Sequence, residues 1–328
     1  MAPESIVLDT TETERHWRDL PEEPTARRRL RWWRELLLVF VLYEVYSLVR
    51  NTFGSSGSSI GSKVSPDAVA IALGHAHDVI NIEKHLGLFF EPRLQEWYLG
   101  LPGHGLIKFW NIYYGSFHFI IPIVVLIWLF RRFPRDYTVW RNALVLTTIV
   151  ALVGFASFSL MPPRLLDHTG QFGGCSLPAS IVAANPQLAC HQFGFIDTLE
   201  SFGGLWSFGS TAMAQVSNQF AAMPSLHIGW STWCAIVVAP RARRRWVKGL
   251  VILYPFATLF CILITANHYW LDAVGGLVTL GVGTVLGWQL ALATHRWADR
   301  RDAKRLVSPA ATSAAAGVPH HGDADAPA

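Results

Sequence analysis

Six long apolar runs, separated by polar and basic stretches, dominate the pattern of this chain. Each run predicts a membrane-spanning helix, because about twenty apolar residues are needed to cross the hydrocarbon of a bilayer. The predicted spans cover residues 32–49, 106–130, 142–160, 226–238, 250–266 and 271–293. The pattern therefore predicts an all-α polytopic membrane protein, with a membrane-embedded domain over residues 32–295.

Two segments between the spans differ from both spans and short loops. Residues 66–98 mix apolar and charged residues too closely to cross a membrane, so we expect helices that lie at its interface. Residues 162–222 are rich in Gly, Ser, Pro and Asn and predict a long loop. Residues 1–31 are expected to be disordered, and the tail 296–328 is expected to be basic at first and disordered from Val307, where it becomes rich in Ala, Pro and Gly.

The distribution of Lys and Arg predicts the orientation of the spans. Arg164 is the only Lys or Arg between Arg141 and Arg241, whereas basic clusters flank the other ends of the spans. Cytoplasmic loops carry the excess of Lys and Arg, so the loop 162–222 is expected to be extracytoplasmic and both termini cytoplasmic. We expect a multi-pass protein of the cell membrane.

Composition supports this class and excludes another. The chain is 51% hydrophobic and only 15% charged, which is more apolar than an ordinary soluble domain. Its net charge of +4 comes from basic blocks that flank apolar runs, so nucleic-acid binding is not expected. Cys175 and Cys190 share the outer loop and are candidates for a disulfide, whereas Cys234 and Cys261 fall within spans.

Three short polar motifs stand where apolar runs end, and they carry the candidate chemistry. An ionisable group at a membrane boundary is costly unless it is paired or hydrated, so three such motifs at one depth indicate a site. The motifs are Met161-Pro162-Pro163-Arg164, Met223-Pro224-Ser225-Leu226-His227 and Asn267-His268-Tyr269-Trp270-Leu271-Asp272.

The residue types in these motifs suit phosphoryl transfer. Asp272 lies one helical turn after His268 and can orient its imidazole as a nucleophile or base, although such a pair can also merely cap a helix. Ser225 and the free N–H groups of its helix start offer donors to an anion, and His227 can protonate a leaving oxygen. The guanidinium of Arg164 can hold two phosphoryl oxygens. No metal is needed for this scheme.

These motifs resemble those of the PAP2 superfamily, the type 2 phosphatidic acid phosphatases, and especially its inositol phosphorylceramide synthase branch. The likeness rests on residues 162–165, 222–227 and 267–273 and extends over residues 70–295. It implies a six-helix membrane bundle in which His268 attacks phosphorus, Asp272 orients it, His227 protonates the leaving group and Arg164 binds phosphate. It implies no cofactor.

The chain departs from the broader superfamily at two phosphate-binding positions. Ser157 stands where the superfamily has a Lys, and Ile262 where it has an Arg. Other groups must then meet the charge of the phosphate. The candidates are helix-terminal N–H groups, Ser225, Asn267, His118, Tyr113 and Arg141, although a His in an aromatic stretch like that around His118 is more often a packed helix residue.

The expected substrate is a phosphorylated lipid or a phospholipid, because its phosphate can sit at headgroup depth while its tail stays in the bilayer. Water as acceptor makes the protein a phosphatase, and a second alcohol makes it a headgroup transferase. Two alternatives remain open: a transporter that uses the His and Asp residues as a proton relay, and an inactive structural protein of the same family.

Overall fold

The computed structural model describes residues 32–53, 65–204 and 219–315, and the predicted disordered N-terminus lies outside this part of the chain. The chain divides into two compact units, Met1–Val41 and Leu42–Ala328, each considered by itself. The described part of the first unit is the beginning of one helix. All of the candidate chemistry lies in the second unit.

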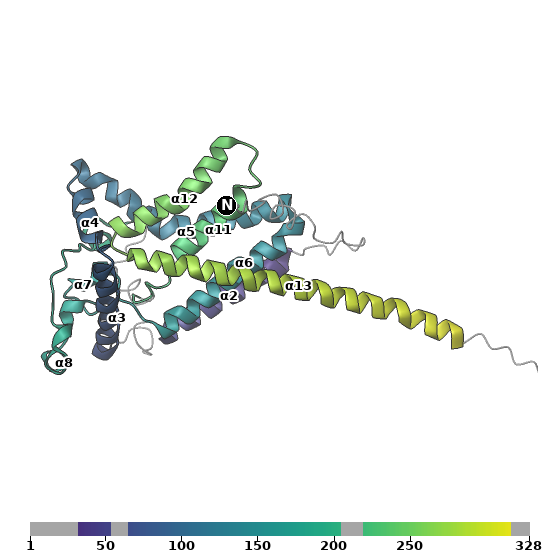
Figure 1. Ribbon diagram of the computed structural model, residues 1–328, viewed down its shortest axis with the longest axis horizontal. Helices are drawn as coiled ribbons and strands as arrows, with labels where there is room; N and C mark the ends of the chain where they lie inside the picture. The colour runs from purple at the N-terminus through teal and green to yellow at the C-terminus, as the bar shows by residue number, and fades with distance from the viewer. Residues whose placement is uncertain (1–31, 54–64, 205–218, 316–328) are drawn as a thin grey trace, which may run out of the picture. The chain divides into compact units, whose positions relative to one another are not determined.

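The described residues form helices and no strand, as the sequence predicts, apart from one isolated parallel bridge between Leu160 and Ala221 (Figure 1). The longer helices are α2 (Trp32–Phe53), α3 (Pro66–His85), α4 (Glu91–Leu99), α5 (Ile107–Arg132), α6 (Pro134–Ser157), α11 (Leu226–Val238), α12 (Arg245–Ile264) and α13 (Trp270–Ala315). The short ones are η1 (Pro102–Leu106), α7 (Pro163–Leu166), η2 (Gly174–Ser176), α8 (Ala179–Ala184), η3 (Pro186–Leu188) and α9 (Thr198–Phe202).

Four of the six predicted spans are confirmed as helices long and apolar enough to cross a membrane. In the described part of the chain these are Pro102–Arg132, Pro134–Ser157, Arg245–Ile264 and Trp270–Thr294. The helix α11 is apolar but has 13 residues, which at 1.5 Å each reach about 20 Å, short of the hydrocarbon thickness of about 30 Å. The helix α2 is not among the four, so the count of six spans stays a prediction.

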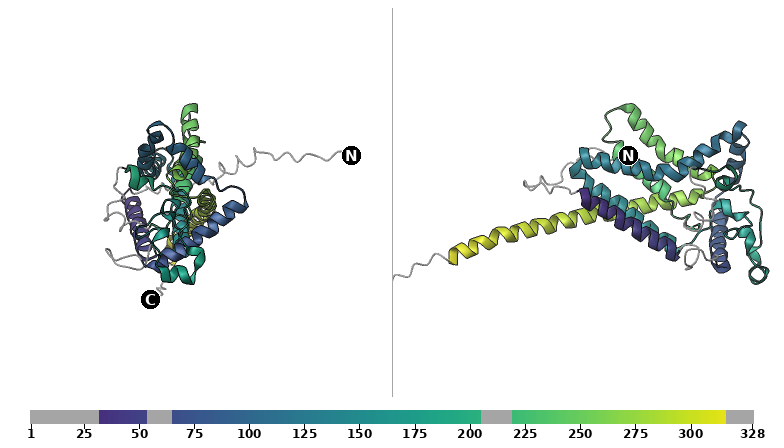
Figure 2. Two further views of the ribbon diagram at one scale, coloured as in Figure 1. Left: turned by 90° about the vertical axis from the view of Figure 1, so that its left-hand side faces the viewer. Right: turned by 180° about the vertical axis from the view of Figure 1, so that it is seen from behind.

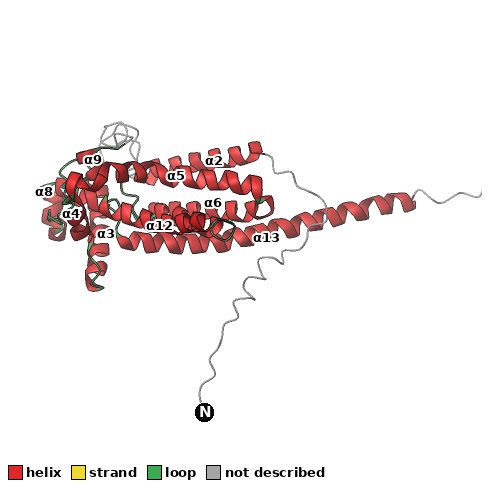
Figure 3. Cartoon of the chain, turned by 90° about the horizontal axis from the view of Figure 1, so that it is seen from above, coloured by secondary structure: helices red, strands yellow, loops and turns green. Residues whose placement is uncertain are grey.

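The short helix α11 lies at the centre of the bundle. It contacts α5, α6, α12 and α13, which run in a similar direction in the view of Figure 3, although Figure 1 shows that α6 and α12 are inclined to α13. Its residue Trp233 is fully buried, with the indole N–H donating to the carbonyl of Trp140 at 3.0 Å. Contact with four helices explains why α11 can be too short to span and still be mostly apolar.

Small residues allow the closest helix pair, α6 and α13, to approach. A Cβ added to Gly283 would lie 2.3 Å from the hydroxyl of Thr147, and one added to Gly287 would lie 2.5 Å from the backbone nitrogen of Ala143. Membrane helices that pack through such residues bring their backbones together without a hydrophobic driving force. The position of α13, and of the motif at its start, is therefore set by backbone contact with α6.

The segment predicted to lie at the interface forms α3 and α4, and neither is among the four spanning helices. One face of α3 is buried, and the helix contacts η2 and η3 of the long loop and, through Glu83, the start of α13. Figure 1 shows α3 beside α7 and α8, at the end of this unit where α13 begins. Their location at a membrane surface stays a prediction.

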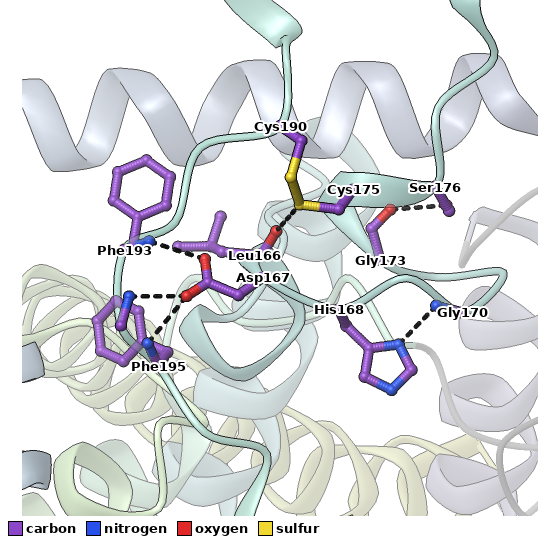
Figure 4. Close-up of a disulfide and its surroundings, with 11 residues drawn as sticks. Leu166, Asp167, His168, Gly170, Gly173, Cys175, Ser176, Cys190, Phe193 and Phe195 are labelled. Atoms are coloured by element: carbon purple, nitrogen blue, oxygen red, sulfur yellow. Dashed lines mark hydrogen bonds between the residues drawn. A yellow bond between two sulfur atoms is a disulfide. The ribbon is translucent and has the colours of Figure 1, made fainter.

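The described part of the long loop contains short helices and cross-links, some of which Figure 4 shows. Cys175 and Cys190 form a disulfide within it. The carboxylate of Asp167 accepts hydrogen bonds from three consecutive backbone N–H groups, at 2.9, 2.7 and 3.1 Å, which belong to Phe193, Gly194 and Phe195. These contacts fold the described part of the loop back against α7, whereas residues 205–218 lie outside the described residues.

The last helix is longer than the sixth predicted span. The apolar part of α13 ends near Thr294, but the helix continues through the basic stretch to Ala315. Figure 2 shows this C-terminal part extending beyond the neighbouring helices. Helix-forming Ala, Arg and Leu residues after position 294 explain the continuation. Residues 316–328 of the predicted disordered tail lie outside the described part.

Candidate active site

Backbone hydrogen bonds bring the three polar motifs together. The N–H of Arg164, in the first motif, donates to the carbonyl of Ala266 at 2.8 Å, directly before the third motif. The N–H of Ser225, in the second, donates to the carbonyl of Asp272 at 3.0 Å. Residues that lie 102 and 47 positions apart in the sequence thus meet near the start of α13.

His268 and Asp272 form a buried pair at the start of α13. The imidazole Nδ1 lies 3.2 Å from Oδ2 of Asp272, and the same oxygen accepts the backbone N–H of Tyr269 at 3.0 Å. With the proton on Nδ1, the carboxylate fixes the tautomer and leaves the lone pair of Nε2 for another partner. Nε2 is buried and has no hydrogen-bond partner among the described residues.

The second histidine lies beside the first. The ring of His227 is 5.3 Å from that of His268, centroid to centroid, and stacks on the ring of Tyr114 at 4.3 Å. Its Nε2 is 3.3 Å from the carbonyl oxygen of Tyr114. A proton on Nε2 donates to that carbonyl, which leaves Nδ1 as the nitrogen available for proton transfer.

His118 joins this cluster from α5. Its ring lies 4.1 Å from that of His227, and its Nδ1 is 2.7 Å from the carbonyl of Tyr114. The three histidines therefore stand in a row that ends at Asp272. Tyr114 was not among the candidates predicted from the sequence, although its spacing of four residues from His118 places both on one face of α5.

Arg164 is held by the folded loop. One terminal nitrogen of its guanidinium, Nη1, forms an ion pair of 2.7 Å with Asp197, and Nη2 donates to the side-chain oxygen of Gln219. Its Nε is buried and has no partner among the described residues. Asp197 and Gln219 are 33 and 55 residues away in sequence, and no pattern in the sequence pointed to either.

Ser225 occupies the N-cap position of α11, yet its hydroxyl makes no cap hydrogen bond. Its Oγ is fully buried and has no partner among the described residues. Gly276 makes the close approach possible, because a Cβ there would lie 2.3 Å from the carbonyl oxygen of Ser225. The hydroxyl and the positive end of α11 are thus available to an anion.

Asn267 has a structural contact in the turn before α13. Its amide nitrogen donates to the carbonyl and the hydroxyl of Thr265, at 3.2 and 2.9 Å. The intervening Ala266 has a φ of 51°, a left-handed conformation that costs a non-glycine residue roughly 1 kcal/mol. The bonds from Asn267 and the one from the N–H of Arg164 hold this turn, which presents His268.

Unpaired buried polar atoms concentrate at this junction. Each such atom costs about 1–3 kcal/mol, so a group of them indicates a missing polar ligand. Three come from three different motifs: Nε of Arg164, Oγ of Ser225 and Nε2 of His268. Two more found among the described residues adjoin them, Nε1 of Trp270 and Oδ1 of Asp272, and Oε2 of Glu83 meets no N–H or O–H donor there.

The two departures from the superfamily pattern supply no charge. The hydroxyl of Ser157 is turned back onto the carbonyl of Val153 at 2.8 Å, and Ile262 is a fully buried apolar residue. Arg141, a further candidate, donates to the side chain of Asn142 in the first half of α6. It lies about 20 Å along α6 from Gly154, the residue of that helix that packs against Pro224 of the second motif. Within the described residues, no group of three or more His, Cys, Asp or Glu is arranged to hold a metal ion.

Two buried glutamates at the start of α13 were not among the candidate residues predicted from the sequence. Glu83 and Glu91 are both fully buried, at the end of α3 and the start of α4. Glu83 continues the buried stripe of α3, which also contains Val69, Ala72, Leu73, Ala76, Val79 and Ile80. A glutamate at helical spacing in an otherwise apolar stripe was the signal that could have revealed it.

Comparison with known proteins agrees with the resemblance seen in the motifs. The family model of the PAP2 superfamily matches residues 77–286, which include all three motifs and both buried glutamates. No curated protein and no solved structure shows a significant match. The match covers more than half of the chain, so this protein belongs to the PAP2 superfamily, whose members are phosphatases or phosphotransferases.

Proposed function

We propose that this protein is an integral membrane enzyme that transfers a phosphoryl group or a phosphorylated headgroup from a lipid through a phosphohistidine at His268. One observation supports it above all. A nucleophilic nitrogen and two hydrogen-bond donors, from His268, Arg164 and Ser225, are buried without partners where three distant motifs meet. A tetrahedral phosphate has the oxygens to satisfy both donors while its phosphorus faces the nitrogen.

The proposed reaction has two steps. In the first, the lone pair of His268 Nε2 attacks phosphorus, the bond to the leaving oxygen breaks, and that oxygen takes a proton from His227. In the second, water or an alcohol attacks the phosphohistidine and gives its proton back to His227, while the electron pair of the P–N bond returns to Nε2. Asp272 stabilises the charge that develops on the His268 ring.

The charges around the site favour a phosphodiester over a terminal phosphomonoester. Arg164 is already neutralised in part by Asp197, at 2.7 Å, and positions 157 and 262 carry no cation. A phosphomonoester brings nearly two negative charges at neutral pH, whereas a phosphodiester brings one. We therefore expect transfer from a phospholipid headgroup linkage to be the preferred reaction.

We further propose that the site faces the extracytoplasmic side. The basic residues Arg131, Arg132 and Arg241 stand at the ends of α5 and α11 remote from α7 and α8 (Figure 1). Clusters of Lys and Arg stay in the cytoplasm, so the opposite end, where the motifs meet, is assigned to the outside.

The test is turnover by purified protein in detergent micelles. The probes are dioctanoyl phosphatidic acid, a monoester, and dioctanoyl phosphatidylglycerol, a diester. We expect phosphate or glycerol phosphate release, and no release from His268→Ala. His85→Ala, an exposed residue of α3, is the matched control and should retain activity. Undiminished turnover in His268→Ala would show that His268 is not the nucleophile.

A proton relay is the second candidate, and the row of His118, His227 and His268 favours it. Neighbouring imidazoles can pass a proton between them across a buried path. Proteoliposomes loaded with a pH-sensitive dye separate the two functions. Proton flux that depends on His227 in the absence of any phosphate release would replace the enzyme by the transporter.

A further inference from the structure

Three carboxyl groups bind three consecutive backbone N–H groups at the start of α13. The N–H of Tyr269 donates to Asp272 at 3.0 Å, that of Trp270 to Oε1 of Glu91 at 3.2 Å, and that of Leu271 to Oε1 of Glu83 at 3.2 Å. The first N–H groups of a helix have no partner within it. Here α3 and α4 provide the partners for two of them, between His268 and Asp272.

The two glutamates also contact each other. Their carboxyl groups are hydrogen bonded, and both residues are fully buried. The second oxygen of Glu91 accepts the N–H of Phe90 at 2.9 Å, whereas Oε2 of Glu83 meets no N–H or O–H donor among the described residues. An oxygen without a donor is the one that carries a proton, so Glu83 is the donor to Glu91.

Burial and charge keep one proton on this pair at neutral pH. Loss of hydration and the neighbouring carboxyl of Glu91 raise the pKa of Glu83 to about 9. Burial also raises the pKa of Glu91. Two buried carboxyl groups in contact do not both ionise until the pH is high, so the pair titrates as a unit.

We propose that Glu83 and Glu91 are positioning residues that share one proton and thereby hold the start of α13, and with it the His268–Asp272 pair, in its reactive arrangement. Neither glutamate contacts the substrate in this proposal. The catalytic part of the proposal rests on the function proposed above, because it concerns the geometry of the same nucleophile.

Loss of the shared proton should disturb this arrangement. The groups that face Glu83 are Glu91 from α4 and Asp272 and Tyr269 from α13, none of which carries a positive charge. A second negative charge on the pair is therefore repelled by Glu91 and Asp272 together. The carboxyl groups then separate, the N–H groups of Trp270 and Leu271 lose partners, and His268 moves.

The experiment compares the pH profiles of wild type, Glu83→Gln and Glu83→Ala, with dioctanoyl phosphatidylglycerol and phosphatidic acid as probes. In Glu83→Gln the amide nitrogen can donate to Glu91 and the amide oxygen can accept from Leu271, without titrating. We expect kcat of wild type to fall as the pH passes through about 9, with KM little changed, and no such fall in Glu83→Gln. Glu83→Ala should lose about tenfold or more in kcat at neutral pH, and Glu83→Gln should recover most of that loss.

Thermal unfolding supplies a readout that needs no turnover. The folded state retains on Glu83 a proton that the unfolded chain releases above the ordinary pKa of 4.5, so stability should fall as the pH rises from there toward about 9. Glu83→Gln should remove this part of the slope. Glu96→Gln, an exposed residue of α4, is the matched control and should leave both profiles unchanged.

The outcomes separate this proposal from the proposed function. If no probe is turned over but Glu83→Gln flattens the unfolding profile, the shared proton stands and the enzymatic role fails. If wild type is active and Glu83→Gln keeps both the alkaline fall in kcat and the slope in stability, the shared proton is refuted. Wild-type kcat in a folded Glu83→Ala variant would overturn the positioning role.

Discussion

At the scale of single residues, the site combines an unpaired imidazole nitrogen of His268 with little positive charge. The guanidinium at the site belongs to Arg164, and the ion pair with Asp197 neutralises part of its positive charge. Asp197 also caps α9, because its carboxylate accepts the N–H groups of Leu199 and Glu200. The pairing has two physical effects. It fixes the direction of the guanidinium before substrate arrives, and it weakens the attraction for a second negative charge.

Removal of the Asp197 charge should therefore change the preference between substrates. In Asp197→Asn the amide keeps much of the shape, and Arg164 regains its full charge. We expect kcat/KM for dioctanoyl phosphatidic acid to rise about tenfold relative to that for dioctanoyl phosphatidylglycerol, a difference of about 1.4 kcal/mol. Glu200→Gln, which removes a nearby exposed carboxylate paired with His168, should leave the ratio unchanged. An unaltered ratio in Asp197→Asn would show that this ion pair does not select the substrate.

Residue patterns predicted one part of this site and not the other. The spacing of His268 and Asp272 placed them on one helical face, and their nitrogen and oxygen lie 3.2 Å apart. Their chemical roles remain predictions. The partners of Arg164 and the glutamates under α13 come from segments 33 or more residues away, and local periodicity carries no information about such contacts.

At the scale of helices, glycine decides how closely the motifs approach. Gly276 in α13 lies against the backbone of Ser225 at the start of α11, whereas Gly281, farther along α13, has open space where a Cβ would stand. The two positions share a helix and an amino acid but differ in their surroundings. They form a matched pair for measuring what the close approach contributes.

Gly276→Ala should destabilise the protein and Gly281→Ala should not. The new methyl group at position 276 would lie 2.3 Å from the carbonyl oxygen of Ser225, which cannot move away without displacing the second motif. Overpacking of this kind costs about 1–3 kcal/mol, whereas an alanine in open helical space is neutral or mildly stabilising. Thermal unfolding in detergent measures both variants, and equal melting temperatures would show that α11 and α13 are farther apart than described.

Hydrophobic runs correctly predicted the four described helices that are long and apolar enough to cross a membrane. They were less informative for α11, a mostly apolar helix of 13 residues that packs against four other helices. An apolar run indicates only that a helix is shielded from water, and either lipid or surrounding protein can shield it. The sequence also did not predict the contacts within the described part of the loop 162–222, which depend on a disulfide and on Asp167 accepting three distant N–H groups.

At the scale of the whole molecule, orientation is the property with the greatest consequence for function. A site on the outer face can act only on lipids exposed there. The prediction rests on the basic residues at one end of the bundle and the near absence of Lys and Arg from the loop at the other.

Cysteine labelling in intact cells tests this orientation. Ser180→Cys lies on the exposed surface of α8, and Arg243→Cys lies in the exposed basic turn between α11 and α12. A membrane-impermeant maleimide should label Ser180→Cys in intact cells, and Arg243→Cys only after the membrane is opened. The native free cysteines Cys234 and Cys261 are buried and should contribute little background. The reverse pattern of labelling would place the site in the cytoplasm.

The sequence by itself determined the class of this protein, the apolar helices and the three motifs, because hydropathy and the spacing of residues along a helix are local properties. Only the tertiary structure revealed that Asp197 neutralises part of Arg164, that α11 is buried by protein, and that Glu83 and Glu91 bind the start of α13. These features depend on distant segments sharing a low-dielectric interior, where each charge and each unpaired N–H is stabilised by whichever group the fold brings beside it.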